Sequence, residues 1–237
     1  MAGTNRETQL SRAAERGEEK RVKALLEAGA EASARDSNQQ DTPLHLAALH
    51  DHEICVRLLL GAGADVHARN WKGISPLHRA VQRQGNKLVR MLLAAGADVG
   101  GIDARGMMPL LVAVGHGGDE VGVGLLLEAG ADVSSRNREQ CTPLHLVARY
   151  GREKVVRLLL KAGADSTSVD ISQRTPLHLG AERGDKVVTM LLDAGADVSA
   201  LDAAACGCTA WCAKGGEGPV GRGRGHGGEE LISENEF

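Results

Sequence analysis

The chain has 237 residues, of which 42% are apolar and only 2% are aromatic. Lysine and arginine number 28 against 31 aspartates and glutamates, so the formal net charge is −3. This near-balance argues against a dedicated binder of nucleic acid or anionic membranes, because such proteins usually carry a basic excess. The apolar fraction excludes disorder throughout, and the few rings exclude an aromatic-rich core or a row of base-stacking platforms.

The N-terminal segment and the cysteine content indicate an intracellular protein. Residues 1–21 are charged and lack the apolar stretch of a secretory signal. No apolar run approaches the ~18 residues that span a bilayer. The five cysteines are odd in number and do not form the pattern of a disulfide framework. We therefore expect a reduced, cytoplasmic or nuclear protein that is not secreted and has no membrane contact.

The N-terminal part, residues 5–35, is similar to the units that follow it but lacks their leading motif. In the slot that holds Pro-Leu-His further along the chain it has Gln9, Leu10 and Ser11. Its predicted helices carry many charges, as the exposed end of a stack of units requires. We expect this segment to cap a repeat array.

Two motifs then recur in phase through the chain. The first motif begins at Thr42 (TPLHLAA), Ser75 (SPLHRAV), Met108 (MPLLVAV), Thr142 (TPLHLVA) and Thr175 (TPLHLGA), at intervals of 33, 33, 34 and 33 residues. The second motif, AGAE or AGAD, begins at Ala28, Ala62, Ala95, Ala129, Ala162 and Ala194. A shared period of this length indicates an array of structural repeats.

Each repeat predicts two short helices followed by a loop. Thr42 is a good N-cap, and Pro43 at the first helical position loses no hydrogen bond. A second helix is expected over about 53–61, and Gly63 stands where a left-handed residue ends it. The apolar residues that we expect at helical spacing in this second helix are Ile54, Leu58 and Leu59.

These motifs resemble the signature of ankyrin-repeat proteins, over about residues 5–214. One repeat alone has too little apolar surface to fold, so neighbours must stack. The resemblance implies an all-α solenoid of helix-turn-helix units with β-hairpin-like finger loops. It also implies that the first helices and the fingers line a concave face, which in this family usually binds another protein.

We divide the chain accordingly. The expected units are an N-terminal capping repeat at 5–38, ankyrin repeats at 39–71, 72–104, 105–138, 139–171 and 172–204, a partial repeat at 205–214 and a disordered glycine-rich tail at 215–237. The repeat at 105–138 departs most from the pattern, because Leu111 replaces histidine and its inter-helix turn is one residue longer. Five glycines lie between Gly115 and Gly124, and each glycine inside a helix costs about 0.5–1 kcal/mol relative to alanine. We predict that the array opens most readily there.

The sequence offers no catalytic or cofactor motif. No GxxxxGK[ST], GxGxxG or GxSxG string is present, and His52-Glu53 lacks the second histidine of a zinc-binding helix. Because four histidines share one repeat position, they lie spaced along the stack and cannot hold a common ion; the resemblance implies that they bind neighbouring turns. They are His45, His78, His145 and His178. We expect no enzyme, no cofactor and no metal.

Residues 206–226 leave two alternatives open. Cys206, Cys208 and Cys212 could join His226 as zinc ligands, although their spacing matches no C-x2-C pattern. The Arg222-Gly-Arg224 stretch resembles a minimal RNA-binding element, but glutamates surround it. We favour incidental cysteines and a solvated linker.

The finger tips and the exposed side of the first helices remain as candidate binding residues. Trp, Tyr, Arg and Met are enriched at the cores of interfaces. On the exposed side of the first helices, one repeat position holds Arg83, Tyr150 and Arg183, and in the other two repeats it holds His50 and His116. The predicted contacts with a protein partner are Trp71, Lys72, Ile74, Arg83, Arg105, Met107, Arg138, Gln140, Tyr150, Ile171, Arg174 and Arg183.

Basic residues on successive fingers suggest that the partner presents an acidic surface or peptide. We therefore predict a monomeric, non-catalytic interaction module that acts as a scaffold, adaptor or inhibitor, with nucleic acid not expected as a partner. The alternative is a regulatory or substrate-targeting subunit of an enzyme complex such as a ligase or phosphatase. A tail-dependent zinc or RNA binder comes third.

Overall fold

The computed structural model describes residues 2–36, 40–117, 119–181 and 185–197 of the chain. Within these ranges it contains twelve helices and no strand. The helices are α1 (Ala2–Glu15), α2 (Glu19–Glu27), α3 (Pro43–Leu49), α4 (Glu53–Gly61), α5 (Pro76–Gln82), α6 (Asn86–Ala94), α7 (Pro109–Gly115), α8 (Glu120–Glu128), α9 (Pro143–Tyr150), α10 (Glu153–Lys161), α11 (Pro176–Ala181) and α12 (Asp185–Asp193).

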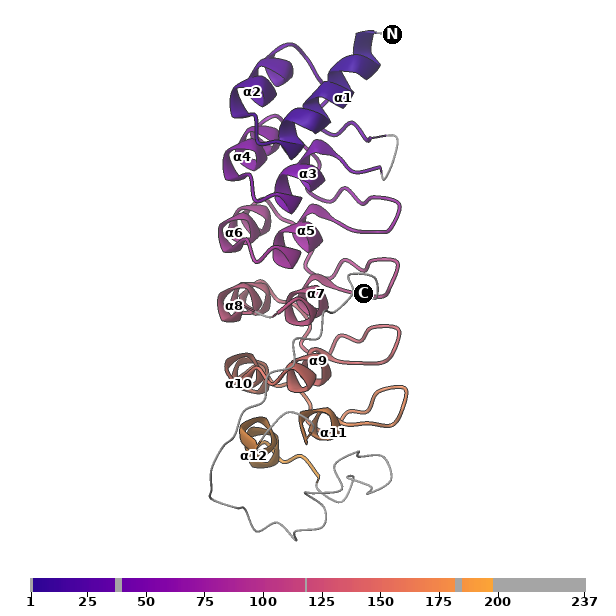
Figure 1. The fold of residues 1–237 in the computed structure, drawn as a ribbon, viewed down its shortest axis with the longest axis vertical. Helices are drawn as coiled ribbons and strands as arrows, with labels where there is room; N and C mark the ends of the chain where they lie inside the picture. The colour runs from indigo at the N-terminus through magenta and orange to yellow at the C-terminus, as the bar shows by residue number, and fades with distance from the viewer. Residues whose placement is uncertain (1, 37–39, 118, 182–184, 198–237) are drawn as a thin grey trace, which may run out of the picture.

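The helices form two parallel columns, which confirms the predicted all-α solenoid. Odd-numbered helices stack in one column and even-numbered helices in the other, and the finger loops project beyond the odd column (Figure 1). Each helix packs against its own partner and against the equivalent helices of the neighbouring repeats. The inner column, α1 to α11, therefore lies between the outer helices and the fingers.

The recurring motif starts α3, α5 and α9 by a reciprocal cap. The hydroxyl of Ser75 accepts from the backbone amide of His78 at 3.4 Å, while the ring Nδ1 of His78 accepts from the Ser75 amide at 3.2 Å. Thr142 and His145 repeat the arrangement before α9. Each pair satisfies two amides that a helix start otherwise leaves free.

The core runs along the stack between the two columns. Leu44, Leu77, Leu110, Leu144 and Leu177, all from the recurring motif, have at most 1% of their surface exposed. The three apolar residues expected at helical spacing all lie in α4, which buries Cys55, Val56 and Leu59 and leaves Ile54 45% exposed. Ile54 lies on the rim of the apolar stripe, at the position that holds exposed Lys87 in α6 and exposed Lys154 in α10.

Glycine ends every outer helix as predicted. The glycines of the AGAE and AGAD motifs have φ between 81° and 88°, a region that side chains with a Cβ rarely adopt. At the N-terminus α1 begins at Ala2, and Leu10 is fully buried in the slot of Leu44. The predicted partial repeat and the tail lie outside the described residues.

Candidate functional site

Four finger loops are each closed by one Asp or Asn side chain. The Oδ1 atom of Asp103 accepts from the amides of Arg105 and Met107, both at 2.8 Å. Asn70, Asn137 and Asp170 make the same pair of contacts in their own fingers, at 2.8 to 3.0 Å. The fingers are therefore preformed turns, which present their tip residues with little ordering cost on binding.

The motif histidines tie each inner helix to the next finger. His45 Nε2 lies 2.9 Å from the carbonyl oxygen of Ile74, His78 Nε2 lies 3.1 Å from that of Met107, and His145 Nε2 lies 3.0 Å from that of Arg174. Because Nδ1 accepts from an amide, the proton is assigned to Nε2, which donates to the carbonyl. Burial lowers the pKa of all three rings. These three histidines thus have structural partners on both nitrogens.

A groove opens on the finger side between α7 and α9, and we call it the finger groove. It has a volume of about 580 Å³ and is formed by two adjacent fingers and the C-terminal ends of the two helices. Its lining residues are Arg105, Met107, Gly115, His116, Asn137, Arg138, Glu139, Leu146, Arg149 and Tyr150. The groove therefore combines an apolar floor, from Met107, Leu146 and Tyr150, with three arginines.

Gly115 leaves part of this space open. A Cβ added at Gly115 would meet only the Met107 Cε atom, at 4.0 Å. The same repeat position holds Leu49 in α3 and Gln82 in α5. Absence of a side chain at the end of α7 is thus one reason why a groove exists at this junction.

The arginines of the groove differ in their partners. Arg105 Nε donates to the Asp103 carboxylate at 3.3 Å, so its charge is partly balanced within its own finger. Arg138 is exposed and has no carboxylate within ion-pair distance in the described part of the chain. Glu139 adds one negative charge to the lining. The groove is consequently only moderately basic.

Four of the twelve predicted contact residues meet in the finger groove, namely Arg105, Met107, Arg138 and Tyr150. Two apolar side chains lie on other finger tips, where Trp71 is 61% and Ile171 is 68% exposed. Lys72 Nζ lies 4.8 Å above the Trp71 ring. Ile74 is half-buried beneath that finger.

Of the other predicted contacts, two arginines already bind groups within the array, and one glutamine has an unusual backbone conformation. Arg174 is half-buried and pairs with the Asp170 carboxylate at 2.9 Å, and Arg83 Nε donates to the Leu49 carbonyl at 3.0 Å. Gln140 is exposed, with a positive φ of 60°. Arg183 lies outside the described residues.

The predicted contact list omitted Arg149, Leu146 and Gly115 from the groove. Arg149 and Leu146 come from α9, and they meet the finger at 105–107 only after two repeats have stacked. Gly115 stands out when the repeats are aligned, because it alone lacks a side chain among Leu49, Gln82, Gly115, Arg149 and Glu182. Alignment of the repeats was thus the sequence signal that points to an open space at Gly115.

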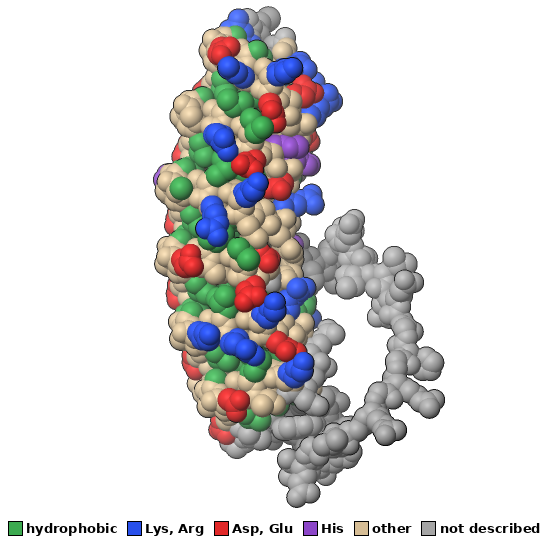
Figure 2. Space-filling view, turned by 90° about the vertical axis from the view of Figure 1, so that its left-hand side faces the viewer, with side chains coloured by type: hydrophobic (Ala, Val, Ile, Leu, Met, Phe, Trp, Pro, Cys, Tyr) green, Lys and Arg blue, Asp and Glu red, His purple; other side chains and the backbone are tan. Residues whose placement is uncertain are grey.

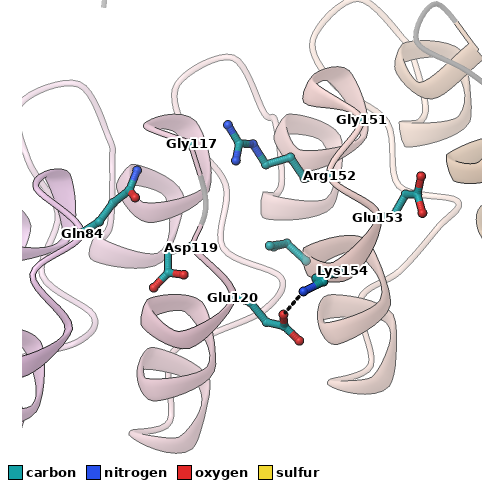
Figure 3. Close-up of a pocket in the computed structure, with 9 residues that line it drawn as sticks. Gln84, Gly117, Asp119, Glu120, Gly151, Arg152, Glu153 and Lys154 are labelled. Atoms are coloured by element: carbon teal, nitrogen blue, oxygen red, sulfur yellow. Dashed lines mark ion pairs between the residues drawn. The ribbon is translucent and has the colours of Figure 1, made fainter.

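A second groove, of about 510 Å³, lies at the turns between the inner and outer helices of the same two repeats and includes Gln84 of the preceding repeat (Figure 3). Glu120 and Lys154 point toward each other there, with 3.5 Å between Oε2 and Nζ. A hydrogen bond from Asn86 lowers the pKa of Asp119 at its edge. With charges of both signs and no aromatic side chain in its lining, this turn groove is the weaker candidate.

The outer helices present a mixed surface. Blue and red side chains are interspersed along this face, with apolar atoms between them, and no broad area of one charge is visible (Figure 2). No helix of the described residues is long and apolar enough to cross a membrane. The same residues contain no group of three or more His, Cys, Asp or Glu side chains that could hold a metal ion.

The described cysteines are unsuited to nucleophilic chemistry. Cys55 and Cys141 are free and buried. Burial, together with the nearby Asp170 and Glu139 carboxylates, raises the pKa of the Cys141 thiol to about 11. Since the thiolate is the reactive form, Cys141 is inert at neutral pH. Cys206, Cys208 and Cys212 lie outside the described residues.

The model for ankyrin repeats in three copies matches residues 2–70, 77–170 and 110–202. The chain belongs to the ankyrin-repeat family. A search of curated proteins found no match. Ankyrin repeats are in general protein–protein interaction modules and are typically non-catalytic, which agrees with the coarse function predicted from the sequence.

Proposed function

We propose that this ankyrin-repeat protein binds a protein partner in the finger groove and acts by binding rather than by catalysis. The observation that carries the proposal is the finger groove itself, where Met107, Arg138 and Tyr150 face one hollow from two adjacent repeats. Tyrosine, arginine and methionine are among the residue types enriched at the cores of interfaces. The preformed fingers on both sides keep the ordering cost of binding low.

The lining favours a partner segment with an apolar side chain next to acidic residues. Leu146 and the Tyr150 ring, which is 38% exposed, offer an apolar surface at the floor. Arg138 and Arg149 stand beside this floor and attract carboxylates. The partly balanced Arg105 and the negative Glu139 limit the strength of this attraction, so we expect the apolar contact to dominate the affinity.

A substitution that fills the finger groove tests this proposal. Peptides are first selected on the full chain from a displayed random library, and their affinities are then measured by fluorescence anisotropy. We expect Gly115→Leu to weaken binding by about tenfold or more, because leucine occupies the open space. The fold should persist, since leucine has a higher helix propensity than glycine by about 0.8 kcal/mol and its Cβ would meet only the flexible end of Met107, at 4.0 Å.

Gly61→Leu is the matched control. Gly61 is likewise the last residue of a helix, it lies on the exposed outer column, and its added Cβ would meet nothing within 4 Å. This variant should bind the selected peptides as the wild type does. Equal affinity in the Gly115→Leu variant would overturn the finger groove as the binding site.

The charge component predicts a moderate salt effect. For an acidic selected peptide, raising the salt from about 50 mM to about 500 mM should weaken binding several-fold, because the exposed guanidinium of Arg138 is screened. A matched peptide with glutamine in place of its glutamates should bind with little dependence on salt. Salt-insensitive binding of the acidic peptide would contradict an acidic partner.

We further propose a reducing, intracellular setting for this interaction. The free, buried Cys55 and Cys141 and the odd cysteine count support it, because secreted proteins usually pair their cysteines. Fractionation of cells that express the tagged chain tests the setting. Recovery of the protein mainly from the medium would contradict it.

A further inference from the structure

The sequence that follows the described array has a composition that fits the finger groove. Residues 229–237, EELISENEF, contain four glutamates and the apolar residues Leu231, Ile232 and Phe237, with no basic residue. The finger groove has three arginines around an apolar floor. An acidic segment with apolar side chains is the chemistry that the proposed function assigns to the partner.

The chain is also long enough for this segment to reach the finger groove. The described residues end at Asp197, one repeat beyond α9, and residues 198–228 add 31 residues before the acidic segment. Stacked helices lie about 10 Å apart, so the path back to α9 is roughly 20–30 Å. An extended chain covers about 3.3 Å per residue, so 31 residues span this distance several times over.

We propose that residues 229–237 of this chain occupy the finger groove and compete with the partner for it. The glutamates meet Arg138 and Arg149, and an apolar side chain from Leu231 or Ile232 rests against Met107 and Tyr150. The inference rests on the proposed function, because it concerns the same groove. It makes the protein self-inhibited, and a partner must displace the segment before it can bind.

Photo-crosslinking of the full chain tests the proposal. p-Benzoyl-phenylalanine is incorporated in place of Ile232, the sample is irradiated, and the crosslinked peptides are identified by mass spectrometry. Benzophenone reacts readily with methionine C–H bonds, so we expect adducts at Met107 or within 146–150, in monomeric protein. Because the contact is intramolecular, the yield should not change on about tenfold dilution.

Charge variants identify the role of the arginines. Arg138→Glu/Arg149→Glu should lower the groove adduct by about fivefold or more, whereas the matched pair Arg90→Glu/Arg157→Glu, on exposed positions of α6 and α10, should leave it unchanged. Replacing the four tail glutamates with lysine should restore the adduct in the Arg138→Glu/Arg149→Glu background. Restoration also shows that the doubly substituted array is folded.

Adducts that fall mainly outside the finger groove would overturn the proposal, and so would a mainly dimeric adduct that is lost on dilution. A crosslinking yield that stays the same in both sets of charge variants would overturn it as well. A competition measurement separates this failure from failure of the proposed function. Glu229→Gln/Glu230→Gln/Glu234→Gln/Glu236→Gln should tighten binding of the selected peptides by about three- to tenfold. If affinity is unchanged here but falls in Gly115→Leu, the groove binds a partner and only the tail contact is wrong.

Discussion

Three finger glutamines, Gln40, Gln140 and Gln173, adopt a backbone conformation that costs a glutamine more than a glycine. Gln140 and Gln173 have φ near 60°, at the turn position where Gly73 and Gly106 have φ of 70° and 79°. We predict that Gln140→Gly raises the free energy of unfolding by about 0.5–1 kcal/mol, because glycine adopts this region without a Cβ clash. Urea unfolding measures the gain as a higher midpoint at unchanged slope.

The reverse substitution, from glycine to a residue with a Cβ, should lower the free energy of unfolding. Gly106 combines its positive φ with a close neighbour, because an added Cβ would lie 3.1 Å from the Arg138 backbone nitrogen. Gly106→Ala should therefore lower the midpoint, by more than Gln140→Gly raises it. Stability that is unchanged in both variants would contradict this account of the finger turn.

At the scale of elements, the junction between α7–α8 and α9–α10 lacks links that other junctions have. Leu111 has no ring nitrogen to reach the next finger, as His45, His78 and His145 do. Arg69 donates to the Ile102 carbonyl at 2.9 Å, and Arg136 donates to the Val169 carbonyl at 2.8 Å. Ile102 occupies the same repeat position as these two arginines, but its side chain has no donor. Met108, at the start of α7, has no hydroxyl cap. This junction thus lacks the histidine and arginine links of its neighbours, and the Glu120–Lys154 ion pair crosses it on the outer side.

We predict that α8, with Gly122 and Gly124 in its interior, has the fastest exchange among the outer helices of the central repeats. Native-state hydrogen exchange should show weaker protection at 121–127 than at 155–160 in α10. Met108→Thr/Leu111→His restores the motif and should raise protection at 121–127. Strong protection there in the wild type would show that the repeat is not the weak point.

Periodicity predicted the elements well because each repeat encodes its own helices. The second helix expected at 53–61 coincides with α4, and Gly63 has the left-handed conformation that the AGAD motif requires. The finger groove could be predicted only in part, since Met107 and Leu146 lie far apart in sequence and meet through stacking. Likewise, the pairing of Arg174 with Asp170 depends on side-chain geometry that a list of exposed basic positions does not contain.

For the whole molecule, the histidines that link successive repeats make stability depend on pH. Burial lowers the pKa of His45, His78 and His145 from the ordinary value of 6.5, so the unfolded chain binds protons more readily than the array. Their stabilising contribution is full above pH 6.5 and is lost as the pH falls below it. Each histidine adds a slope of up to about 1.4 kcal/mol per pH unit.

Urea midpoints between about pH 8 and pH 5 measure this effect, and they should fall on acidification. His145→Gln should reduce the slope, whereas His67→Gln, at an exposed position without a link to the next repeat, should not. Midpoints that rise or stay constant toward pH 5 would contradict the neutral, hydrogen-bonded state of the three rings.

The finger groove spans the junction where Leu111 and Ile102 replace the histidine and arginine that link other repeats. A ligand in contact with both Met107 and Tyr150 holds its full set of contacts only while the two repeats remain packed. Its binding free energy therefore stabilises the packed state of that junction and leaves the stability of the other junctions unchanged. We expect the N-terminal and C-terminal halves to melt as separate units without ligand and as one unit with ligand. Occupancy of the groove would then appear in calorimetry as a sharper transition, so that binding sets the cooperativity of the entire array.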